Sequence, residues 1–350
     1  MKGEGNMTRE ISMSAALNEA IKLAMRKDDH VILMGEDVAG GANVDHLQDD
    51  EAWGGVLGVT KGIVQEFGRE RVLDTPISEA GYIGAAMAAA STGLRPIAEL
   101  MFNDFIGTCL DQVLNQGAKF RYMFGGKAEV PITIRTTHGA GFRAAAQHSQ
   151  SLYALFTSIP GLKVIVPSTP YDAKGLLLAA IEDQDPVIFF EDKTLYNMTG
   201  DVPEEYYTLP IGKADIKRKG ADVTIVAVGK QVHTALQAAE QLSTRGIEAE
   251  VLDPRSLSPL DEEAVLASVE KTNRLVIVDE ANPRCSIAAD IASLAADKGF
   301  DSLDAPVKKV TAPHTPVPFS PPLEDLYLPT PEKVVNTVLE MLGETSTHTL

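Results

Sequence analysis

The sequence predicts two tandem α/β domains, and three observations support this fold class. Apolar runs of strand length alternate with helical patterns over residues 31–190, and the same alternation returns over residues 222–298. The strand segments are apolar throughout, which is typical of a parallel sheet covered on both faces. A length of 350 residues is sufficient for two domains that each bury a core of their own.

The first series of strands and helices predicts a domain over residues 8–192. Its expected strands are Val31–Met34, Pro96–Phe102, Pro131–Thr136, Lys163–Val166 and Val187–Phe190. Its expected helices are Ser14–Arg26, Asp104–Phe124 and Tyr171–Glu182. Each strand is short and apolar and each helix has a repeating apolar face, so the order is that of a βα series.

The periodicity lapses over residues 193–220, for which we expect an interdomain linker. A second βα series then predicts a domain over residues 221–343. Its expected strands are Asp222–Val228, Glu250–Asp253 and Arg274–Asp279. Its expected helices are Gln231–Leu242, Asp261–Lys271 and Ser286–Lys298. The chain is therefore predicted to fold as two α/β domains in tandem.

The composition of the chain argues against several classes of protein. The chain is 44% apolar and 23% charged, which is typical of a soluble globular protein. No uncharged apolar run is long enough to cross a membrane, and the N-terminal residues lack the apolar segment of a secretory signal. Two cysteines, Cys109 and Cys285, have no metal-ligand spacing, which favours a cytoplasmic location. A net charge of −18 argues against nucleic-acid binding.

The most informative segment is Asp74-Thr-Pro-Ile-Ser-Glu79, which joins an extended stretch to a predicted helix. That helix consists almost entirely of glycine and alanine from Gly81 to Ala90. Such a helix has little bulk for a core and favours close approach by another backbone or a flat ligand. We therefore expect Glu79 to be functional, although an acid at a helix start also stabilises the helix dipole.

A second candidate segment follows the strand Pro131–Thr136. Gly139-Ala-Gly-Phe-Arg-Ala144 matches a dinucleotide-binding loop in form, but the next strand ends in Pro167-Ser-Thr without the expected acid. Four residues beyond the loop, His148 lies between polar neighbours, where a histidine can act as a general acid or as an anion donor. A loop histidine bonded to a backbone carbonyl is an equally good interpretation.

Two acidic segments complete the candidates. Glu36 and Asp37 follow the first strand, and the carboxyl ends of parallel strands line the ligand crevice of α/β sheets. A capping role for the loop is equally compatible with this pair. The corner Glu182-Asp-Gln-Asp185 offers carboxylates and carbonyls to a cation, although such a corner is more commonly a solvated turn.

Together these segments form an ordered set that resembles a known family. The blocks are Met34-Gly-Glu-Asp-Val, Asp74-Thr-Pro-Ile-Ser-Glu79, Lys119-Phe-Arg-Tyr-Met-Phe-Gly-Gly, Ala145-Ala-Gln-His148-Ser-Gln, Pro160-Gly-Leu-Lys-Val and Asp172-Ala-Lys-Gly-Leu. They resemble the β subunit of the thiamine-diphosphate-dependent dehydrogenase component of 2-oxoacid dehydrogenase complexes. The resemblance covers the chain from about Met7, a second candidate start residue.

Three further blocks most resemble the acetoin dehydrogenase branch of this family. They begin at Trp53, Asp279 and Thr311. The resemblance implies a transketolase-like pyrimidine-binding domain followed by a transketolase C-terminal domain. It also implies a heterotetramer of two α and two β subunits that serves a lipoyl-bearing acyltransferase core. The diphosphate of the cofactor and its magnesium would be held by the α subunit, which agrees with the absence of a Gly-Asp-Gly…Asn motif here.

The resemblance assigns roles residue by residue. Glu79 matches the glutamate that hydrogen-bonds the aminopyrimidine ring nitrogen of thiamine diphosphate, and protonation there activates the cofactor. Phe105 and Glu36 match residues near the same ring, and His148 matches a histidine of the substrate channel. Positions around a structural potassium ion, mostly main-chain oxygens, match Ile132, Ala180, Ile181, Asp183 and Asp185.

We expect the chain to cleave acetoin with its α subunit and to pass the acetyl unit to a lipoyl group. Pyruvate or a branched-chain 2-oxoacid is the alternative substrate. A non-catalytic assembly subunit would retain the fold but would not need Glu79 or His148. A nicotinamide oxidoreductase would use the Gly139 loop to bind NAD.

Overall fold

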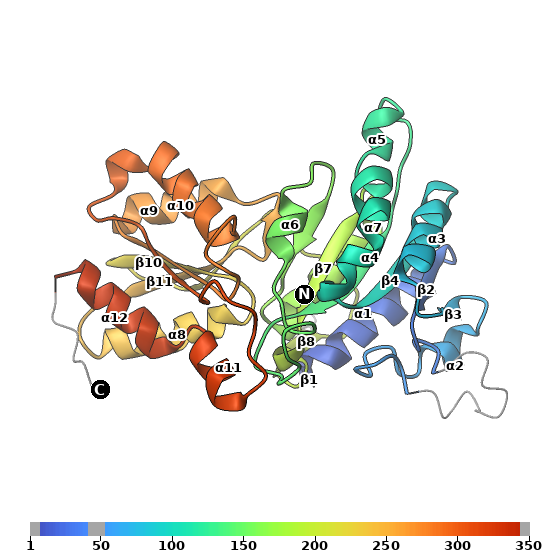
Figure 1. The fold of residues 1–350 in the computed structure, drawn as a ribbon, viewed down its shortest axis with the longest axis horizontal. Coiled ribbons are helices and arrows are strands. Elements are labelled where there is room, and N and C mark those ends of the chain that lie inside the picture. Colours follow the sequence, from blue (N-terminus) through green and yellow to red (C-terminus); the bar gives the residue numbers. More distant parts are fainter. Residues whose placement is uncertain (1–7, 41–52, 344–350) are drawn as a thin grey trace, which may run out of the picture. The chain divides into compact units, whose positions relative to one another are not determined.

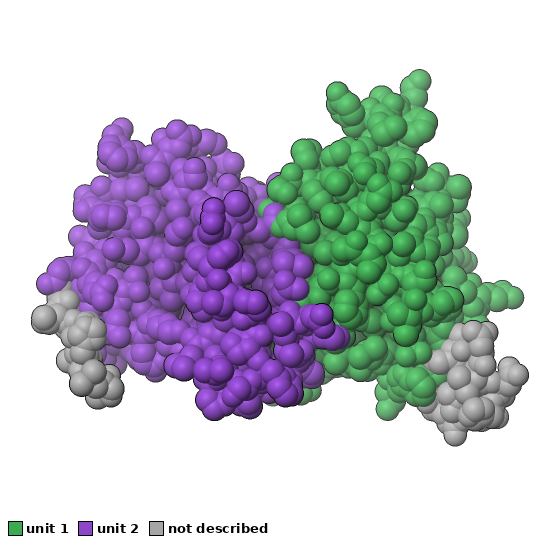
Figure 2. All heavy atoms as spheres, in the orientation of Figure 1, with its two compact units in different colours: residues 1–138, 155–211 green, residues 139–154, 212–350 purple. Residues whose placement is uncertain are grey.

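The computed structural model describes residues 8–40 and 53–343 and divides them into two compact units. Unit 1 contains residues up to 138 together with 155–211, and unit 2 contains residues 139–154 together with those from 212 onward. Figure 2 colours the two units separately. The predicted pair of α/β domains is confirmed, with one difference: the segment 139–154, which follows a strand of unit 1, belongs to unit 2.

Unit 1 is built on a parallel sheet (Figure 1). In spatial order its strands are β6 (Lys163–Ile165), β7 (Val187–Asp192), β5 (Thr133–His138), β4 (Arg95–Phe102), β2 (Val31–Gly35) and β3 (Val72–Asp74). Every neighbouring pair in this order is parallel. Strands β2, β5 and β7 are buried along their whole length, which explains their continuous apolar sequence.

The helices of unit 1 pack in pairs and bury small and aliphatic side chains. They are α1 (Met13–Lys27), α2 (Ile63–Phe67), α3 (Glu79–Ser91), α4 (Ile106–Asp111), α5 (Phe120–Met123), α6 (Tyr153–Thr157, across the unit boundary) and α7 (Pro170–Glu182). Helix α1 packs on α7, and α3 packs on α4. The single helix predicted over Asp104–Phe124 is wrong, because a 3₁₀ turn, a π-helical turn and α5 interrupt it.

Residues 193–220, for which we expect a linker, contain regular structure at both ends. Strand β8 (Thr199–Pro203) pairs antiparallel with β1 (Thr8–Ser12) in unit 1. Strand β9 (Asp215–Arg218) pairs antiparallel with β11 of unit 2. The backbone between them, residues 204–214, crosses from one unit to the other.

Unit 2 has a five-stranded sheet of its own. Its order is β14 (Lys308–Thr311), β13 (Leu275–Asp279), β10 (Val223–Ala227), β11 (Ala249–Asp253) and β9 (Asp215–Arg218). Its helices are α8 (Gln231–Ser243), α9 (Glu262–Thr272), α10 (Ile287–Lys298), α11 (Pro321–Tyr327) and α12 (Pro331–Met341). Helices α8 and α12 pack together beside this sheet, as do α9 and α10. No helix among the described residues has the length and apolar character that a membrane span requires.

Candidate active site

Three of the predicted site residues follow neighbouring strands of unit 1. Glu36 comes directly after β2, Glu79 begins α3 beyond β3, and Phe105 ends a 3₁₀ turn beyond β4. Strand β2 is parallel to both β3 and β4, so the three side chains lie at the same edge of the sheet. The carboxyl edge of a parallel sheet is where α/β domains bind ligands.

Close backbone contacts fix this edge. Gly35 pairs with Asp74 on one side and with Glu99 on the other. A Cβ on Gly35 would lie 3.0 Å from the Glu99 Cβ, so a larger residue would push β2 and β4 apart. The Asp74 carboxylate accepts a hydrogen bond from the Ala39 N–H, which ties the loop after Glu36 to the end of β3. The loop that carries Glu36 is therefore held on two sides.

Glu36 is a carboxyl group of this edge whose pKa is raised. Burial raises its pKa to about 7, and the negative charges of Glu79, Asp37 and Glu99 add to the increase. Its Oε1 atom is buried and has no hydrogen-bond partner among the residues that the structure describes. A buried polar atom left unpaired costs about 1–3 kcal/mol. This oxygen is therefore a natural acceptor for a donor group of a ligand.

Glu79 is half-buried at the first position of α3, where its charge acts on the groups around it. Burial raises the pKa of the Cys109 thiol to about 12, and the charge of Glu79 is the next cause. The Tyr82 phenol is buried and donates to the Glu99 carbonyl oxygen at 3.2 Å. Ile77, two residues before Glu79, is 83% exposed. The glutamate thus lies between a buried polar patch and an open surface.

Phe105 gives the edge an aromatic side chain. Its ring meets the ring of Phe102 edge to face, with the centroids 5.6 Å apart. The Lys193 ammonium lies over the Phe102 ring, with Nζ 5.5 Å from the centroid. Two carboxyl groups and an aromatic pair therefore line the same edge, which can hold a flat, polar ring.

His148 lies in the other part of the chain. The segment 139–154 belongs to unit 2, where His148 is half-buried. The backbone N–H of His148 donates to the Ala145 carbonyl at 3.4 Å. The sequence does not reveal this assignment, because the segment directly follows β5 of unit 1. His148 therefore belongs to unit 2, whereas Glu36, Glu79 and Phe105 belong to unit 1.

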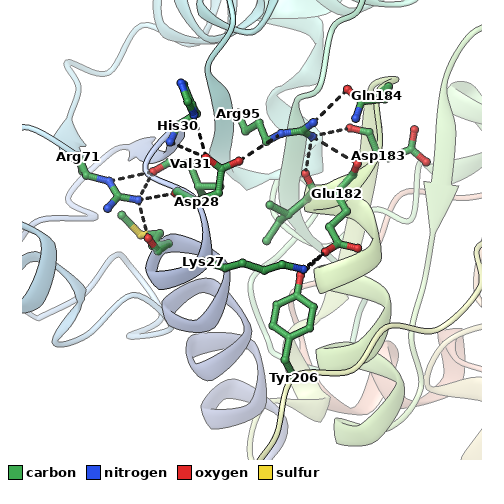
Figure 3. Close-up of polar contacts among 12 residues, drawn as sticks. Lys27, Asp28, His30, Val31, Arg71, Arg95, Glu182, Asp183, Gln184 and Tyr206 are labelled. Carbon is green, nitrogen blue, oxygen red and sulfur yellow. Dashed lines mark hydrogen bonds and ion pairs between the residues drawn. The ribbon is translucent and has the colours of Figure 1, made fainter.

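The segment predicted to bind a cation lies at the end of α7 in unit 1, where Arg95 contacts several of its main-chain oxygens (Figure 3). Helix α7 ends here, and the Arg95 guanidinium donates to the carbonyls of Ile181 at 3.2 Å, Glu182 at 3.4 Å and Asp183 at 3.2 Å. The Ala180 carbonyl accepts from the Asp183 N–H, and the Ile132 carbonyl accepts from the Val187 N–H. Each of these main-chain oxygens retains a second lone pair.

The carboxylates of the corner are already neutralised. Lys163 Nζ lies 2.5 Å from one oxygen of Asp183 and 2.7 Å from the other. Arg121 donates to Asp185. A potassium ion would meet fixed cations at this corner, because Arg95 donates to the carbonyls of Ile181 and Asp183. Lys163 and Arg121 are likewise paired with the two carboxylates.

One buried network was not predicted from the sequence. Arg135 on β5 is 1% exposed and makes two bonds to Glu191 on β7, at 2.7 and 2.8 Å, and one to Glu99 on β4, at 2.6 Å. The Tyr196 hydroxyl donates to Glu191 at 2.6 Å. The available signal was the presence of Glu99, Arg135 and Glu191 in segments with strand patterns, since charges inside a sheet are buried only when paired. The Glu99 charge of this network also contributes to the raised pKa of Glu36.

Comparison with known proteins places the two units in order. Residues 9–199 match the transketolase pyrimidine-binding domain, and residues 212–334 match the transketolase C-terminal domain. The chain is 82% identical to the acetoin:2,6-dichlorophenolindophenol oxidoreductase subunit beta of Bacillus subtilis (strain 168), over 97% of this chain and 99% of the relative. The chain belongs to the family of dehydrogenase β subunits that contain these two domains.

Other members of this family have lower sequence identity to this chain. The oxidoreductase subunit beta of Cupriavidus necator that bears the same name is 60% identical over 94% of this chain and 96% of the relative. The pyruvate dehydrogenase E1 component subunit beta of Bacillus subtilis is 42% identical over 95% and 99%. A solved split-gene transketolase in an inactive β4 tetramer has a TM-score of 0.75 at 22% identity, covering 95% of this chain and 98% of that one. This last likeness concerns the fold alone.

Proposed function

We propose that this chain is the β subunit of a thiamine-diphosphate-dependent dehydrogenase that cleaves acetoin. With its α subunit it passes the acetyl unit to a lipoyl group of an acyltransferase core. Identity supports this substrate over a 2-oxoacid: two relatives named for acetoin are 82% and 60% identical, whereas the 2-oxoisovalerate and pyruvate relatives from Bacillus subtilis are each 42% identical.

The observation that carries the proposal is the carboxyl pair at the edge of the unit 1 sheet. An aminopyrimidine ring presents an amino donor and basic ring nitrogens. Glu36 offers a buried oxygen that lacks a donor among the described residues, and Glu79 offers a second carboxyl group beside it. Phe105 supplies an aromatic surface at the same edge. The residues present therefore fit this end of the cofactor.

Each side chain has a distinct task in this proposal. Bound thiamine diphosphate supplies the carbon nucleophile that breaks the carbon–carbon bond of the substrate. Glu79 holds a proton on the ring nitrogen, as the general acid of cofactor activation. Glu36 accepts a hydrogen bond near the same ring, and Phe105 packs beside it. His148 exchanges protons with the reacting substrate, since an imidazole can both donate and accept a proton.

The chain would supply only half of the active site. It has no Gly-Asp-Gly…Asn motif for a diphosphate and magnesium, and we propose that the α subunit holds both. Exposed apolar residues support a large interface on unit 1: Ile77 is 83% exposed, and Tyr122, Met123 and Phe124 are 88%, 67% and 55% exposed. Helix α5, which carries Tyr122, projects away from the unit 1 sheet (Figure 1). We propose an assembly of two α and two β subunits.

We further propose a potassium site and a cytoplasmic location for the protein. Main-chain oxygens at Ile132, Ala180 and Ile181 would bind potassium at the end of α7, together with the backbone of Asp183 and Asp185. Cys109 is buried and Cys285 exposed, and both are free thiols, in keeping with a cytoplasmic location.

Reconstitution tests the proposed function. The chain is purified alone and with its α subunit, and acetoin-dependent reduction of 2,6-dichlorophenolindophenol is measured with and without thiamine diphosphate and magnesium. We expect turnover only when both chains and the cofactor are present. Equal turnover without thiamine diphosphate would contradict the proposal. Binding of NAD by the chain alone would instead favour the oxidoreductase alternative at the Gly139 loop.

A further inference from the structure

The segment that carries His148 lies at the carboxyl edge of the unit 2 sheet. Lys230 follows β10, and Glu280 follows β13, which is parallel to β10. Both side chains contact residues of the segment 139–154. In α/β domains this edge normally receives a ligand. In unit 2 the chain's own segment contacts the residues at that edge.

The start of the segment is held by buried acids and by packing. The Ala140 N–H donates to Glu280 at 3.3 Å, and Lys230 donates to the Ala140 carbonyl. The Gly141 N–H donates to Glu324 of helix α11 at 2.6 Å. The Ala140 side chain packs in one apolar cluster with Ala312, Val317 and Tyr327.

Arg143 adds a second attachment to the same helix. Its guanidinium donates to the Glu324 carboxylate at 2.8 Å, to Asp325 at 2.6 Å and to the Pro321 carbonyl at 3.1 Å. The Glu324 side chain is fully buried, so its charge has to be matched by these partners. One carboxylate thus bonds both the backbone of Gly141 and the side chain of Arg143.

The end of the segment is held by β13. The Ser151 hydroxyl donates to Glu280 at 2.6 Å, and the Tyr153 hydroxyl donates to Asp279. Glu280 is in turn paired with Lys230 at 2.7 Å. Glu280 therefore connects both ends of the segment, at Ala140 and at Ser151.

The backbone between these ends is strained. Arg143 and Ala145 have φ values of 63° and 62°, and Gly139 and Gly141 have 95° and 99°. Residues other than glycine adopt such angles at a cost and keep them only where the surroundings enforce them. The middle of the segment borders a cavity of about 270 Å³, lined in part by Ala146, Gln150, Asn282 and His314. The ends are clamped, and Ala146 and Gln150, on either side of His148 in the sequence, line this cavity.

We infer that unit 2 positions His148 through this clamp, with Glu324 and Glu280 as its positioning residues. The inference rests on the proposed role of His148 and adds a function for the C-terminal domain. Glu324 holds the backbone of Gly141 and the side chain of Arg143. Arg143, whose backbone is strained, lies only five residues before His148. Losing it would let the histidine leave its working position without removing any group that touches substrate.

A double-mutant cycle on the assembled enzyme tests this inference. Glu324→Ala, His148→Ala and the double variant are compared with the parent for acetoin-dependent transfer of the acetyl unit to a lipoyl domain. Glu324→Ala should lower turnover by about tenfold to a hundredfold, the scale expected for a misplaced group. In the His148→Ala background it should lower turnover by about twofold or less, because the two residues act as a unit.

Amide exchange provides a readout that does not depend on the chemistry of His148. Exchange of residues 140–151 should become faster in Glu324→Ala, intermediate in Glu324→Gln, and unchanged in Glu332→Gln, an exposed control on α12. Unchanged exchange in Glu324→Ala, or an equal loss of turnover in both backgrounds, would overturn the inference. If His148→Ala alone keeps full activity, the proposed role of His148 fails, and the exchange result still decides whether unit 2 clamps the segment.

Discussion

Glu79 lies close enough to Glu36 for its negative charge to raise the pKa of the Glu36 carboxyl, which burial already moves upward, to about 7 in all. The two residues follow the adjacent parallel strands β3 and β2. Enzymes commonly use two neighbouring carboxyl groups for acid–base catalysis when their surroundings move the two pKa values apart. The raised pKa of Glu36 lets this edge hold a proton near neutral pH, beside the Glu79 carboxyl group that our account places on the ring nitrogen.

Replacing Glu79 by Gln is the first prediction. Glutamine retains the shape of the side chain but cannot exchange the proton, so turnover of acetoin by the assembled enzyme should fall by about 10²–10⁴-fold. Dye reduction under saturating cofactor measures this. Glu70→Gln, an exposed position between α2 and β3, is the matched control and should stay near parent activity. A Glu79→Gln enzyme with full turnover would remove Glu79 from the mechanism.

The second prediction concerns pH and Glu36. The pKa of Glu36 is raised in the folded chain, so the folded state binds the proton more tightly than the unfolded state and loses stability as pH rises to about 7. Glu36→Gln removes this titration. The melting temperature of the isolated variant should therefore exceed that of the parent at about pH 8.5, by more than it does at about pH 5.5. A difference that is constant with pH would show that Glu36 is not perturbed.

The third prediction addresses the buried network of Arg135 with Glu99 and Glu191. Arg135→Met leaves Glu191 and Glu99 buried without their cation, and breaking such a pair costs about 3–5 kcal/mol. Denaturant unfolding of the variant measures the loss. Adding Glu191→Gln and Glu99→Gln should recover much of the stability, because the unpaired charges are removed. A loss below about 1 kcal/mol for Arg135→Met would contradict the role of the network.

The fourth prediction tests the cation corner. Potassium chloride should stabilise the chain more than choline chloride of equal ionic strength, by about 2.7 kcal/mol at a hundred times the dissociation constant. Asp185→Asn should keep this difference even if it lowers stability overall, because the proposed ligand is the main-chain oxygen. Equal stability in the two salts would exclude a specific potassium site at the end of α7.

Much of the fold could be predicted because buried parallel strands have a simple signature. Strand β2 is apolar and buried at every position, and its predicted span differs from the observed one by a single residue. Helix α12 was not predicted, although Val334, Val335 and Val338 give it an apolar face after the Thr330 cap. Strand β14 was not predicted, because two of its four residues are exposed lysines and its sequence is not a continuous apolar run.

The candidate site was predictable only in part. The expectation for Glu36 and Glu79 followed from their places after strands, which is a local property of the chain. The Arg135 network depends on register between β4, β5 and β7, and no single strand reveals it. The attachment of the His148 segment to Glu280 and Glu324 joins residues about 130–180 positions apart, which no local pattern encodes.

The substrate is decided most directly by a comparison of kcat/KM for acetoin and for pyruvate. The chain is assembled with its α subunit, thiamine diphosphate and magnesium, and dye reduction is followed with each substrate, with 2-oxoisovalerate as a third arm. Our account predicts that acetoin has the highest kcat/KM and that Glu79→Gln lowers kcat/KM for every substrate, because Glu79 acts on the cofactor. A higher kcat/KM for pyruvate or 2-oxoisovalerate would contradict the assignment of acetoin as substrate.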